Sequence, residues 1–416
     1  MSWKEFILLI LFWLLLYIEP LEIGAFKLSQ IWKGLVVCFL LFYVLNKKIP
    51  AFILIGILFS FKYLIYTYLP YGFIRALYDA LENLIFPLFL GLIYIKYRNI
   101  SNSTEKLHNI SILLSLFFIY QAIPFLFGLE NLHPTTQTIR QFERWGIDET
   151  ALRGLFHGIA VSSKMFTVST IVLLNSYKRF SNNNLNRLFW LISILLGSYF
   201  VFISYARTAW VIYFVAFIVS LFYNTKLNKK LTASVIGMLL IIGILYLYET
   251  HDAFRWRITG EMGFPSYEGI DIENIAYSRL GFIEVAIDNL REEGLAGQLL
   301  GYGTIRGHDL FYQKTGMAIS SHNETFKILE SSGILGLILY VVFICILFSK
   351  VMRNSKYTTD EIKKLSFLSI TMFLGFYFSG HKTPFWGEII YACFFIGVLI
   401  EGKRKNGITN HHKIRG

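Results

Sequence analysis

The chain has 416 residues, of which 55% are hydrophobic and 16% are charged, and its formal net charge is +12. A soluble domain carries about 25% charged residues, so this composition, with its apolar residues in long runs, excludes an ordinary soluble protein and predicts an integral membrane protein. Because backbone amides cannot go unpaired in hydrocarbon, these runs must be helices and the fold class is all-α. The positive charge does not indicate nucleic-acid binding, because lysines and arginines accumulate on the cytoplasmic side of membrane proteins.

About twelve transmembrane helices are predicted, so that residues 1–416 form a single polytopic membrane domain. The first apolar run is interpreted as a retained helix, because no small-residue cleavage site follows it. In chain order the predicted spans are 5–18, 31–45, 50–69, 73–95, 109–127, 156–175, 186–203, 208–223, 231–248, 328–349, 364–379 and 385–400.

The connections between these spans alternate in charge. One set is short and rich in lysine and arginine, which places it and both termini in the cytoplasm by the positive-inside rule. The other set contains two long loops, 128–155 and 249–320, which we expect on the periplasmic or outer side. The larger loop lies between spans 9 and 10. Within it, the apolar spacing over 273–292 predicts an amphipathic helix lying against the membrane domain, and the glycines of "GLAGQLLGYG" (294–303) predict turns.

Arg207 stands out among the arginines of the outer side. It lies in "FISYARTAWVIYFV", where two apolar runs meet with almost no loop between them. A charged residue at that depth is costly and indicates a functional site, although an arginine that reaches the interface with its long side chain is the alternative interpretation.

Further cationic residues are predicted near the same membrane face. Arg279 opens the amphipathic helix, Arg153 lies just before the sixth span, and Arg306 and His308 lie in "GYGTIRGHD". Each of them alone could be a solvated loop residue. Together they form a charged set that suits a diphosphate headgroup, because arginine forks match phosphate oxygens and do not lose their proton.

His322 lies where the chain passes from the large loop into the tenth span. Ser321 and Glu324 form a capping-box pattern that predicts a helix start with His322 as its first residue. The helix dipole disfavours a cation there, so the imidazole stays neutral, as a general base must be. Helical spacing aligns His322 with Gly333 and Gly336, which would allow a neighbouring helix to approach closely. A solvent-satisfied histidine at a water–membrane boundary is the alternative.

Other polar residues within the predicted spans give weaker signals. Asp79, Glu82 and Asn83 recur at helical spacing and could form an ion relay or a polar helix seam, and Lys62 and Lys164 are similarly ambiguous. The sequence contains no metal-ligand spacing and no nucleotide-binding glycine pattern, so neither a metal nor a cofactor is predicted.

The segment "HNETFKILESSGILG" reads His-Asn, nine residues, then Gly-x-x-Gly. This pattern resembles the signature of the bacterial O-antigen polymerase and O-antigen ligase superfamily. "SYARTAW", "SRLGFIEVAIDN" and "LLGYGT" resemble the arginine motifs and the glycine turn of the same family. The resemblance covers the whole chain in architecture and residues 200–336 in motif, and it implies a GT-C-like membrane enzyme.

The family implies a metal-independent, inverting glycosyl transfer at the outer face of the bacterial inner membrane. Its donor is an oligosaccharide on undecaprenyl diphosphate, and a chain-length regulator is a candidate protein partner. By the resemblance, Arg207 and Arg279 would stabilise the leaving diphosphate and His322 would be the base. Arg153 and Asn323 would contribute to substrate binding. Arg306 and His308 match no family position and are kept as substrate-binding candidates because of their location.

The sequence leaves the particular reaction open. We favour a polymerase, because the "LLGYGT" and "SSHNETF" passage resembles polymerases and the last span lacks a clear acidic–arginine pair of the ligase type. An O-antigen ligase that transfers the glycan to lipid A-core is the alternative, and a capsule or exopolysaccharide polymerase would have the same features. A flippase of lipid-linked sugars would use the arginines without a base, but the chain shows no internal repeat of the kind common in transporters.

Overall fold

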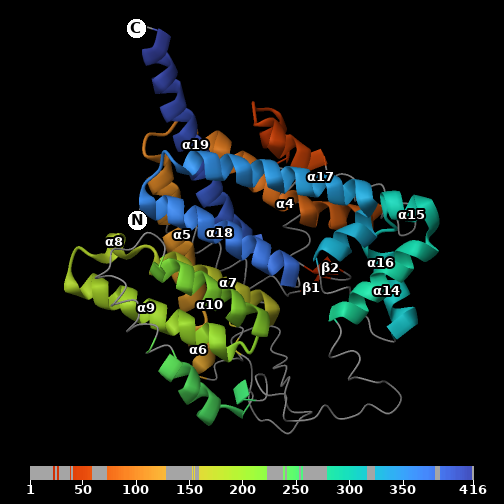
Figure 1. Ribbon diagram of the computed structural model, residues 1–416, viewed down its shortest axis with the longest axis horizontal. Coiled ribbons are helices and arrows are strands. Elements are labelled where there is room, and N and C mark those ends of the chain that lie inside the picture. The colour runs from red at the N-terminus through yellow and green to blue at the C-terminus, as the bar shows by residue number, and fades with distance from the viewer. Residues whose placement is uncertain are drawn as a thin grey trace. The chain divides into compact units, whose positions relative to one another are not determined.

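The computed structural model describes residues 22–23, 26–27, 38, 41–58, 73–127, 152, 154, 159–222, 238, 241–252, 254–255, 279–315, 324–379 and 385–414. Two short strands, β1 (Glu22–Ile23) and β2 (Phe26–Lys27), pair antiparallel. All other regular elements in the described ranges are helical (Figure 1). The expectation of an all-α protein is confirmed at this level.

The described helices follow the apolar runs of the sequence. They are α4 (Phe73–Tyr97), α5 (Ser103–Tyr120), α6 (Ile123–Leu126), α7 (Ile159–Leu174), α8 (Tyr177–Phe180), α9 (Asn184–Ile203), α10 (Arg207–Phe222), α14 (Arg279–Glu292), α15 (Gly294–Leu300), α16 (Thr304–Thr315), α17 (Glu324–Ser355), α18 (Asp360–Ser379) and α19 (Phe385–Ile414). Eight of the twelve predicted spans thus coincide with a named helix. The span 5–18 lies outside the described residues, and the spans 31–45, 50–69 and 231–248 lie there in part.

Three stretches of described helix are long and apolar enough to cross a membrane: Ser103–Leu126, Asn184–Ile203 and Thr325–Ser355. Four further apolar helices are shorter. Long helices of this composition satisfy their backbone hydrogen bonds internally, which is the requirement for a segment in hydrocarbon. The structure therefore supports a membrane protein, while the number of twelve spans stays a prediction.

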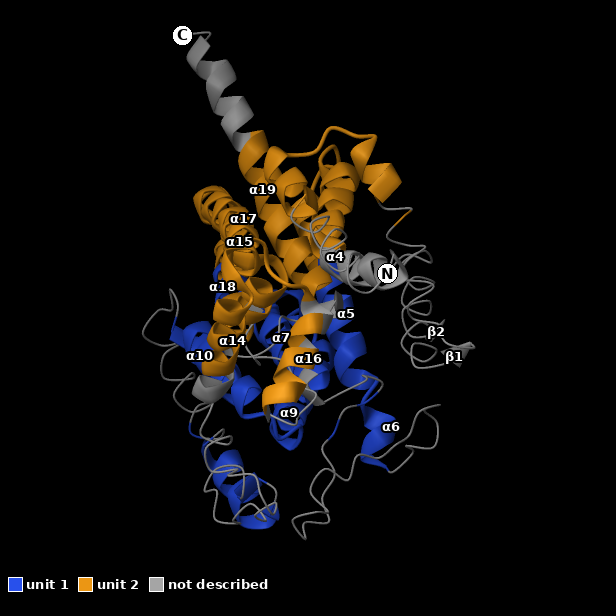
Figure 2. Cartoon of the chain, turned by 90° about the vertical axis from the view of Figure 1, so that its right-hand side faces the viewer, with its two compact units in different colours: residues 1–29, 109–266, 367–372 blue, residues 30–108, 267–366, 373–416 orange. Residues whose placement is uncertain are grey.

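The chain forms two compact units, each assembled from separate segments (Figure 2). Unit 1 contains residues 1–29, 109–266 and 367–372, and unit 2 contains residues 30–108, 267–366 and 373–416. The prediction of a single membrane domain is not decided by this division. The two units are described separately below.

Unit 1 is built on α7, α9 and α10. Helix α9 comes close to its neighbours at Gly197, where a Cβ atom would collide with Thr170 of α7 and lie 2.8 Å from Ile119 of α5. At one end of α9, Trp190 donates a hydrogen bond to the Leu173 carbonyl oxygen at 2.7 Å. The helix has 20 residues, or about 30 Å at 1.5 Å per residue, which matches the thickness of a bilayer core.

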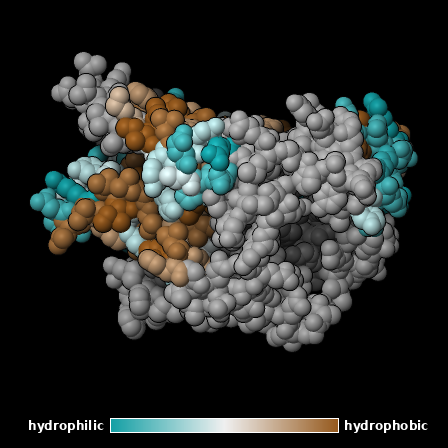
Figure 3. Space-filling model, turned by 90° about the horizontal axis from the view of Figure 1, so that it is seen from below, coloured by the Kyte–Doolittle hydropathy of each residue, from teal (hydrophilic) through white to brown (hydrophobic). Residues whose placement is uncertain are grey.

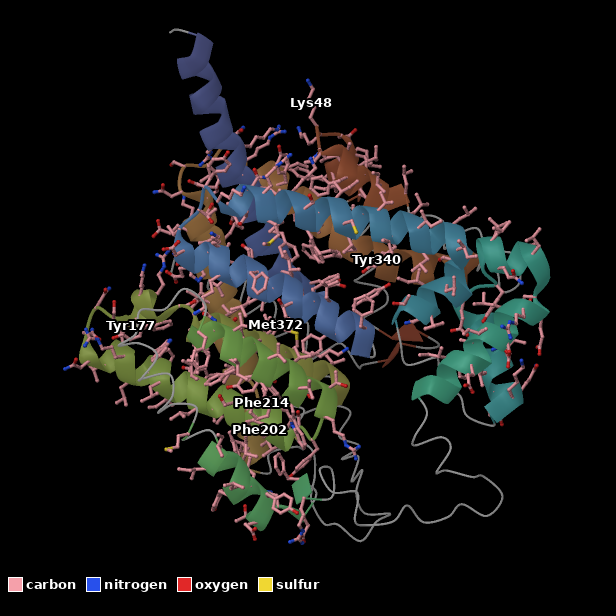
Figure 4. All side chains as sticks on the ribbon, viewed as in Figure 1. Lys48, Tyr177, Phe202, Phe214, Tyr340 and Met372 are labelled. Carbon is pink, nitrogen blue, oxygen red and sulfur yellow. The ribbon has the colours of Figure 1, made fainter. Side chains whose placement is uncertain are left out.

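Unit 2 packs α4, α17 and α19 together. Tyr340 of α17, labelled in Figure 4, stacks on Tyr377 of α18 with ring centroids 5.4 Å apart. At the far end of α17, Asn354 touches Gly402 of α19. Close by on α19, Lys403 donates a hydrogen bond to the Tyr94 hydroxyl at 3.0 Å.

Basic residues gather at this end of unit 2. Arg98, just after α4, donates a hydrogen bond to the Lys48 carbonyl oxygen at 3.0 Å, and Arg404 of α19 donates to the Ile100 carbonyl oxygen. Both interactions involve segments that are predicted to be cytoplasmic. Arg98 joins the connections 96–108 and 46–49, and Arg404 joins the C-terminal segment to the connection 96–108. Within unit 2, the predicted cytoplasmic connections therefore meet at one end.

Large apolar side chains are exposed along the membrane-length helices. They lie mainly on α9, α10 and α17 and include Leu185, Leu188, Leu195, Val211, Ile218, Ile338 and Val342. Figure 3 shows an apolar area of this kind on the face seen from below. Large exposed apolar patches are rare on soluble monomers, so these exposed positions suit a membrane protein.

Candidate functional site

Arg207 is the first residue of α10 and follows a tight turn. Only Ser204, Tyr205 and Ala206 separate α9 from α10, and Tyr205 has a positive φ of 53°. The Tyr205 amide donates to the Phe202 carbonyl oxygen at 3.0 Å, which closes the turn. The predicted hairpin with almost no loop is therefore confirmed.

Aromatic packing fixes the geometry of this turn. Trp210 of α10 reaches back to donate to the carbonyl oxygens of Val201 and Phe202 at 3.0 and 3.2 Å. Phe202 packs against Phe214 with centroids 5.7 Å apart, as Figure 4 shows, and Trp210 packs against Phe254 at 4.6 Å. Side chains from both α9 and α10 consequently hold the turn that precedes Arg207.

The Arg207 side chain is exposed. It makes no hydrogen bond or ion pair with the residues that the structure describes. The N-terminus of a helix disfavours a cation, because the helix dipole is positive there. Among the described residues, Arg207 therefore has no partner for its charge, and its guanidinium is open to the surroundings of the protein.

The segment around Arg153 approaches the same turn. The amide of Leu152 donates to the Ile203 carbonyl oxygen, the last residue of α9, at 3.1 Å. Gly154 has a positive φ of 60°, and a Cβ atom there would lie 2.6 Å from Oε1 of Gln121. Arg153 itself lies outside the described residues, but the preceding residue, Leu152, is held at the end of α9, next to the turn that leads into α10.

The second group of candidates belongs to unit 2. Arg279 is the first residue of α14, and its side chain is not among those described. Further along α14, Ala286 is buried together with Phe311 of α16, and Phe326 of α17 packs against both. The predicted amphipathic helix at 273–292 is confirmed over Arg279–Glu292, and a small apolar core joins it to α16 and α17.

The glycine passage 294–303 is a helix followed by a turn. Residues Gly294–Leu300 form α15, so the prediction of turns through this segment was wrong except at 301–303. Contact with α17 overrides the low helix propensity of the glycines. Gly301 and Gly303 then adopt positive φ angles of 80° and 88°, which only glycine adopts without strain.

Gly333, within α17, is the point at which this helix contacts the end of α15. Its φ of 62° and ψ of −173° break α17 into two helical parts, in a backbone region that is essentially restricted to glycine. A Cβ atom on Gly333 would collide with the Leu299 carbonyl group and lie 2.5 Å from the Gly301 amide nitrogen. The prediction of close approach is confirmed, but the partner is the backbone at Leu299 and Gly301, at the end of α15. The prediction that His322, Gly333 and Gly336 share one helix face was wrong, because the helix is interrupted at Gly333.

A buried polar group lies beside this junction and was missed from the sequence. Tyr302 donates its amide to the Glu330 carbonyl oxygen at 2.8 Å and its hydroxyl to Glu330 Oε1 at 2.9 Å. Glu330 is only 4% exposed. Burial, and next the neighbouring Glu330 carboxylate, raise the pKa of the Tyr302 phenol well above its usual value. The phenol therefore stays protonated and keeps donating to the carboxylate.

Asn289 of α14 completes this buried group. Its side chain is 0% exposed and lies beside the same phenol, where it acts against the rise in the Tyr302 pKa. Neither of its amide atoms forms a hydrogen bond within the described part of the chain. The group thus connects α14, the 301–303 turn and the first part of α17. The sequence signal that could have indicated this buried group is Glu330, a carboxylate inside a mainly apolar run.

We expect Tyr302→Phe to lower the thermal stability of the purified protein. The change removes the hydroxyl that donates to the buried Glu330 carboxylate, and losing such a donor to a buried group costs about 1–3 kcal/mol. The matched control is Tyr312→Phe on α16, where the side chain is 58% exposed, and we expect it to have little effect. Equal melting temperatures for the two variants in detergent would contradict a structural role for the hydroxyl.

Arg306 is engaged by a carboxylate. Its Nε and Nη2 atoms donate to Glu293 Oε1 at 2.9 and 2.6 Å, and Lys314 pairs with Glu292 at 2.8 Å. Both pairs join α16 to the end of α14. Because Glu293 already neutralises Arg306, the proposed mechanism below does not use this arginine.

The remaining candidates are only partly described. His322 and Asn323 lie outside the described residues, immediately before Glu324, the first described residue of α17. The capping prediction at Ser321 lies outside them as well. His308 lies on α16, but its side chain is not described. Arg207 belongs to unit 1, whereas Arg279, His308 and His322 belong to unit 2.

The weaker candidates stand as follows. Lys164 is buried in α7. The side chains of Asp79, Glu82 and Asn83 on α4 are not described, and Lys62 lies outside the described residues. No protein-family model and no curated protein matches this chain.

Proposed function

We propose that this protein is a polysaccharide polymerase that transfers a glycan from undecaprenyl diphosphate to a lipid-linked acceptor unit. The observation that carries the proposal is the conformation of Gly333. In the motif His-Asn-x9-Gly-x-x-Gly, this glycine lies at a fixed distance from His322. The backbone conformation of Gly333 and its packing against Leu299 and Gly301 give a physical reason for a glycine at this position of the motif.

The arginines supply the electrostatic part of the mechanism. Arg207 is exposed and free of partners among the described residues, and Arg279 begins α14. A diphosphate gains negative charge as its bond to the sugar breaks, and fixed guanidinium groups stabilise that charge in the transition state. Arginine suits this role better than lysine, because its planar fork contacts two phosphate oxygens and stays protonated.

His322 supplies the proton transfer. In the proposed step, its neutral imidazole accepts the proton of an acceptor-sugar hydroxyl while the hydroxyl oxygen attacks the anomeric carbon of the donor. The bond from that carbon to the diphosphate oxygen breaks, and undecaprenyl diphosphate leaves with the bonding electrons. Attack opposite to the leaving group inverts the configuration, and no metal or cofactor takes part.

The topology assigned to the enzyme has twelve spans, cytoplasmic termini and an outward-facing site in the bacterial inner membrane. Two charge distributions support it. In unit 1, Lys178, Arg179 and Arg187 lie at one end of α9 and Arg207 follows the other. In unit 2, the basic connections meet at one end of α17, and α15 packs at Gly333, some twenty residues back along the same helix.

A ligase would use the same groups with a different acceptor, lipid A-core. We favour the polymerase for the character of the glycine and histidine passages. A third reading, a flippase for lipid-linked sugars, needs the arginines but not the base.

The experiment that tests the function is a deletion strain with its lipopolysaccharide analysed on gels. A polymerase defect leaves core carrying a single repeat unit, and plasmid expression of the protein restores the ladder of long chains. Bare core, with long chains retained on the lipid carrier, would indicate that the protein is a ligase and not a polymerase. An unchanged ladder would contradict both enzymes.

A further inference from the structure

Helix α17 changes its surroundings at Gly333. Among its described side chains before the break, from Thr325 to Ser332, all are buried or half-buried. Directly after the break, Ile334 and Leu335 are exposed, and Ile338, Leu339, Val341 and Val342 continue this apolar face. The lipid-facing part of the helix therefore begins at Gly333.

Helix α15 ends at this same level. The Leu299 carbonyl group would collide with a Cβ atom on Gly333, and the Gly301 amide nitrogen lies 2.5 Å from that position. Backbone contact this close places Leu299 and Leu300 beside Ile334 and Leu335. Figure 1 shows α15 against one end of α17.

The exposed side of α15 is apolar. Leu295 is 72% exposed, and Leu299 and Leu300 are also exposed. Leu295 and Leu299 are four residues apart and share one face of the helix, while Gly297 is buried. This face of α15 lies next to the exposed apolar residues of α17, because the two helices meet at Gly333.

The charges next to α15 are paired. Glu292 and Glu293 lie just before the helix, and Lys314 and Arg306 of α16 neutralise them at 2.8 and 2.6 Å. Unpaired carboxylates would oppose the approach of an anionic lipid surface and would be costly to desolvate. With the pairs in place, the end of α14 presents little net charge to a membrane.

We propose that α15 is a membrane-contacting helix whose Leu295, Leu299 and Leu300 insert into the interfacial region of the bilayer. The large loop is thereby anchored on the lipid as well as on α17. Apolar side chains on one face of a short helix bury in the headgroup and acyl boundary in this way. The proposal concerns a lipid surface and does not depend on the enzymatic function.

The test uses an environment-sensitive fluorophore on single cysteines. Cys38, Cys345 and Cys393 are first replaced by serine, and Leu295→Cys, Leu299→Cys and Leu300→Cys are labelled separately in vesicles of phosphatidylcholine and phosphatidylglycerol. Ile338→Cys on α17 is the lipid-facing reference. Asp288→Cys on α14 and Gln313→Cys on α16 are the matched references, because both side chains are exposed and polar.

We expect the α15 labels to show blue-shifted emission, quenching by spin-labelled lipids and protection from aqueous iodide, as at Ile338. The Asp288 and Gln313 labels should be quenched by iodide. Iodide quenching on α15 equal to that at Asp288 would overturn the proposal. Protection from both quenchers would also overturn it, in favour of a protein contact. Three independent positions keep the test decisive if one variant does not fold.

Discussion

Replacing His322 by alanine is expected to lower glycan transfer by about 10²–10⁴-fold, because a positioned general base contributes this much to a proton-transfer step. The protein should still reach the membrane in normal amounts. The measurement is chain elongation in proteoliposomes supplied with a lipid-linked repeat unit, with product lengths resolved on gels. His412→Ala, in the C-terminal part of α19, is the matched control and should elongate normally.

A comparison of the Arg207→Ala and His322→Ala variants distinguishes an enzyme from a flippase. Loss of one electrostatic stabiliser costs about 10²–10³-fold in other enzymes, so both variants of an enzyme should be impaired. A flippase would lose function in Arg207→Ala only. Normal elongation by His322→Ala, at wild-type protein level, would remove the histidine from the proposed mechanism. Arg207→Lys should recover only part of the activity, because the charge returns without the planar fork.

Replacing Gly333 by alanine is expected to be the most destabilising change at the junction of α15 and α17. The φ of 62° and ψ of −173° strain a residue with a Cβ atom by about 1–3 kcal/mol. The collision with the Leu299 backbone adds about 1–3 kcal/mol of overpacking. The observable is the melting temperature in detergent, together with the amount of protein in the membrane fraction.

Two other glycines separate the strain from the collision. Gly294 has a φ of 68° but nothing within 4 Å of its Cβ position, and Gly243 in the helix Ile241–Thr250 has open space and no positive φ. We expect Gly294→Ala to cost about 1–2 kcal/mol and Gly243→Ala to be neutral or stabilising by up to about 1 kcal/mol. A Gly333→Ala variant as stable as Gly243→Ala would show that the junction is not tightly packed.

The prediction of helices from apolar runs was correct for the long apolar segments, since a helix pairs all backbone groups within the segment itself. The eight matched spans, α9 and α17 among them, are helices because a long apolar segment must pair its own backbone groups. The turn before Arg207 was predicted because two such runs leave no room for a loop. Arg207 was singled out for the cost of a charge at the predicted depth, and its functional role stays a prediction.

The structure of the large loop, 249–320, was predicted less well. Local rules favoured turns at 294–303, because the four glycines of this segment have low helix propensity. Tertiary contact with α17 made Gly294–Leu300 helical instead. The buried partners Asn289, Tyr302 and Glu330 come from three segments of the chain, so no local pattern could have joined them.

By itself, the sequence determined the membrane character, the positions of the apolar helices and the basic residues at their ends, since each depends on the composition of a local segment in lipid or water. Only the tertiary structure decided where α17 breaks, what packs on Gly333 and which charges are already paired. A backbone angle at one glycine and an ion pair between Arg306 and Glu293 are set by groups far apart in the chain. Steric contact and charge pairing act through space, so they follow from the fold and not from sequence spacing.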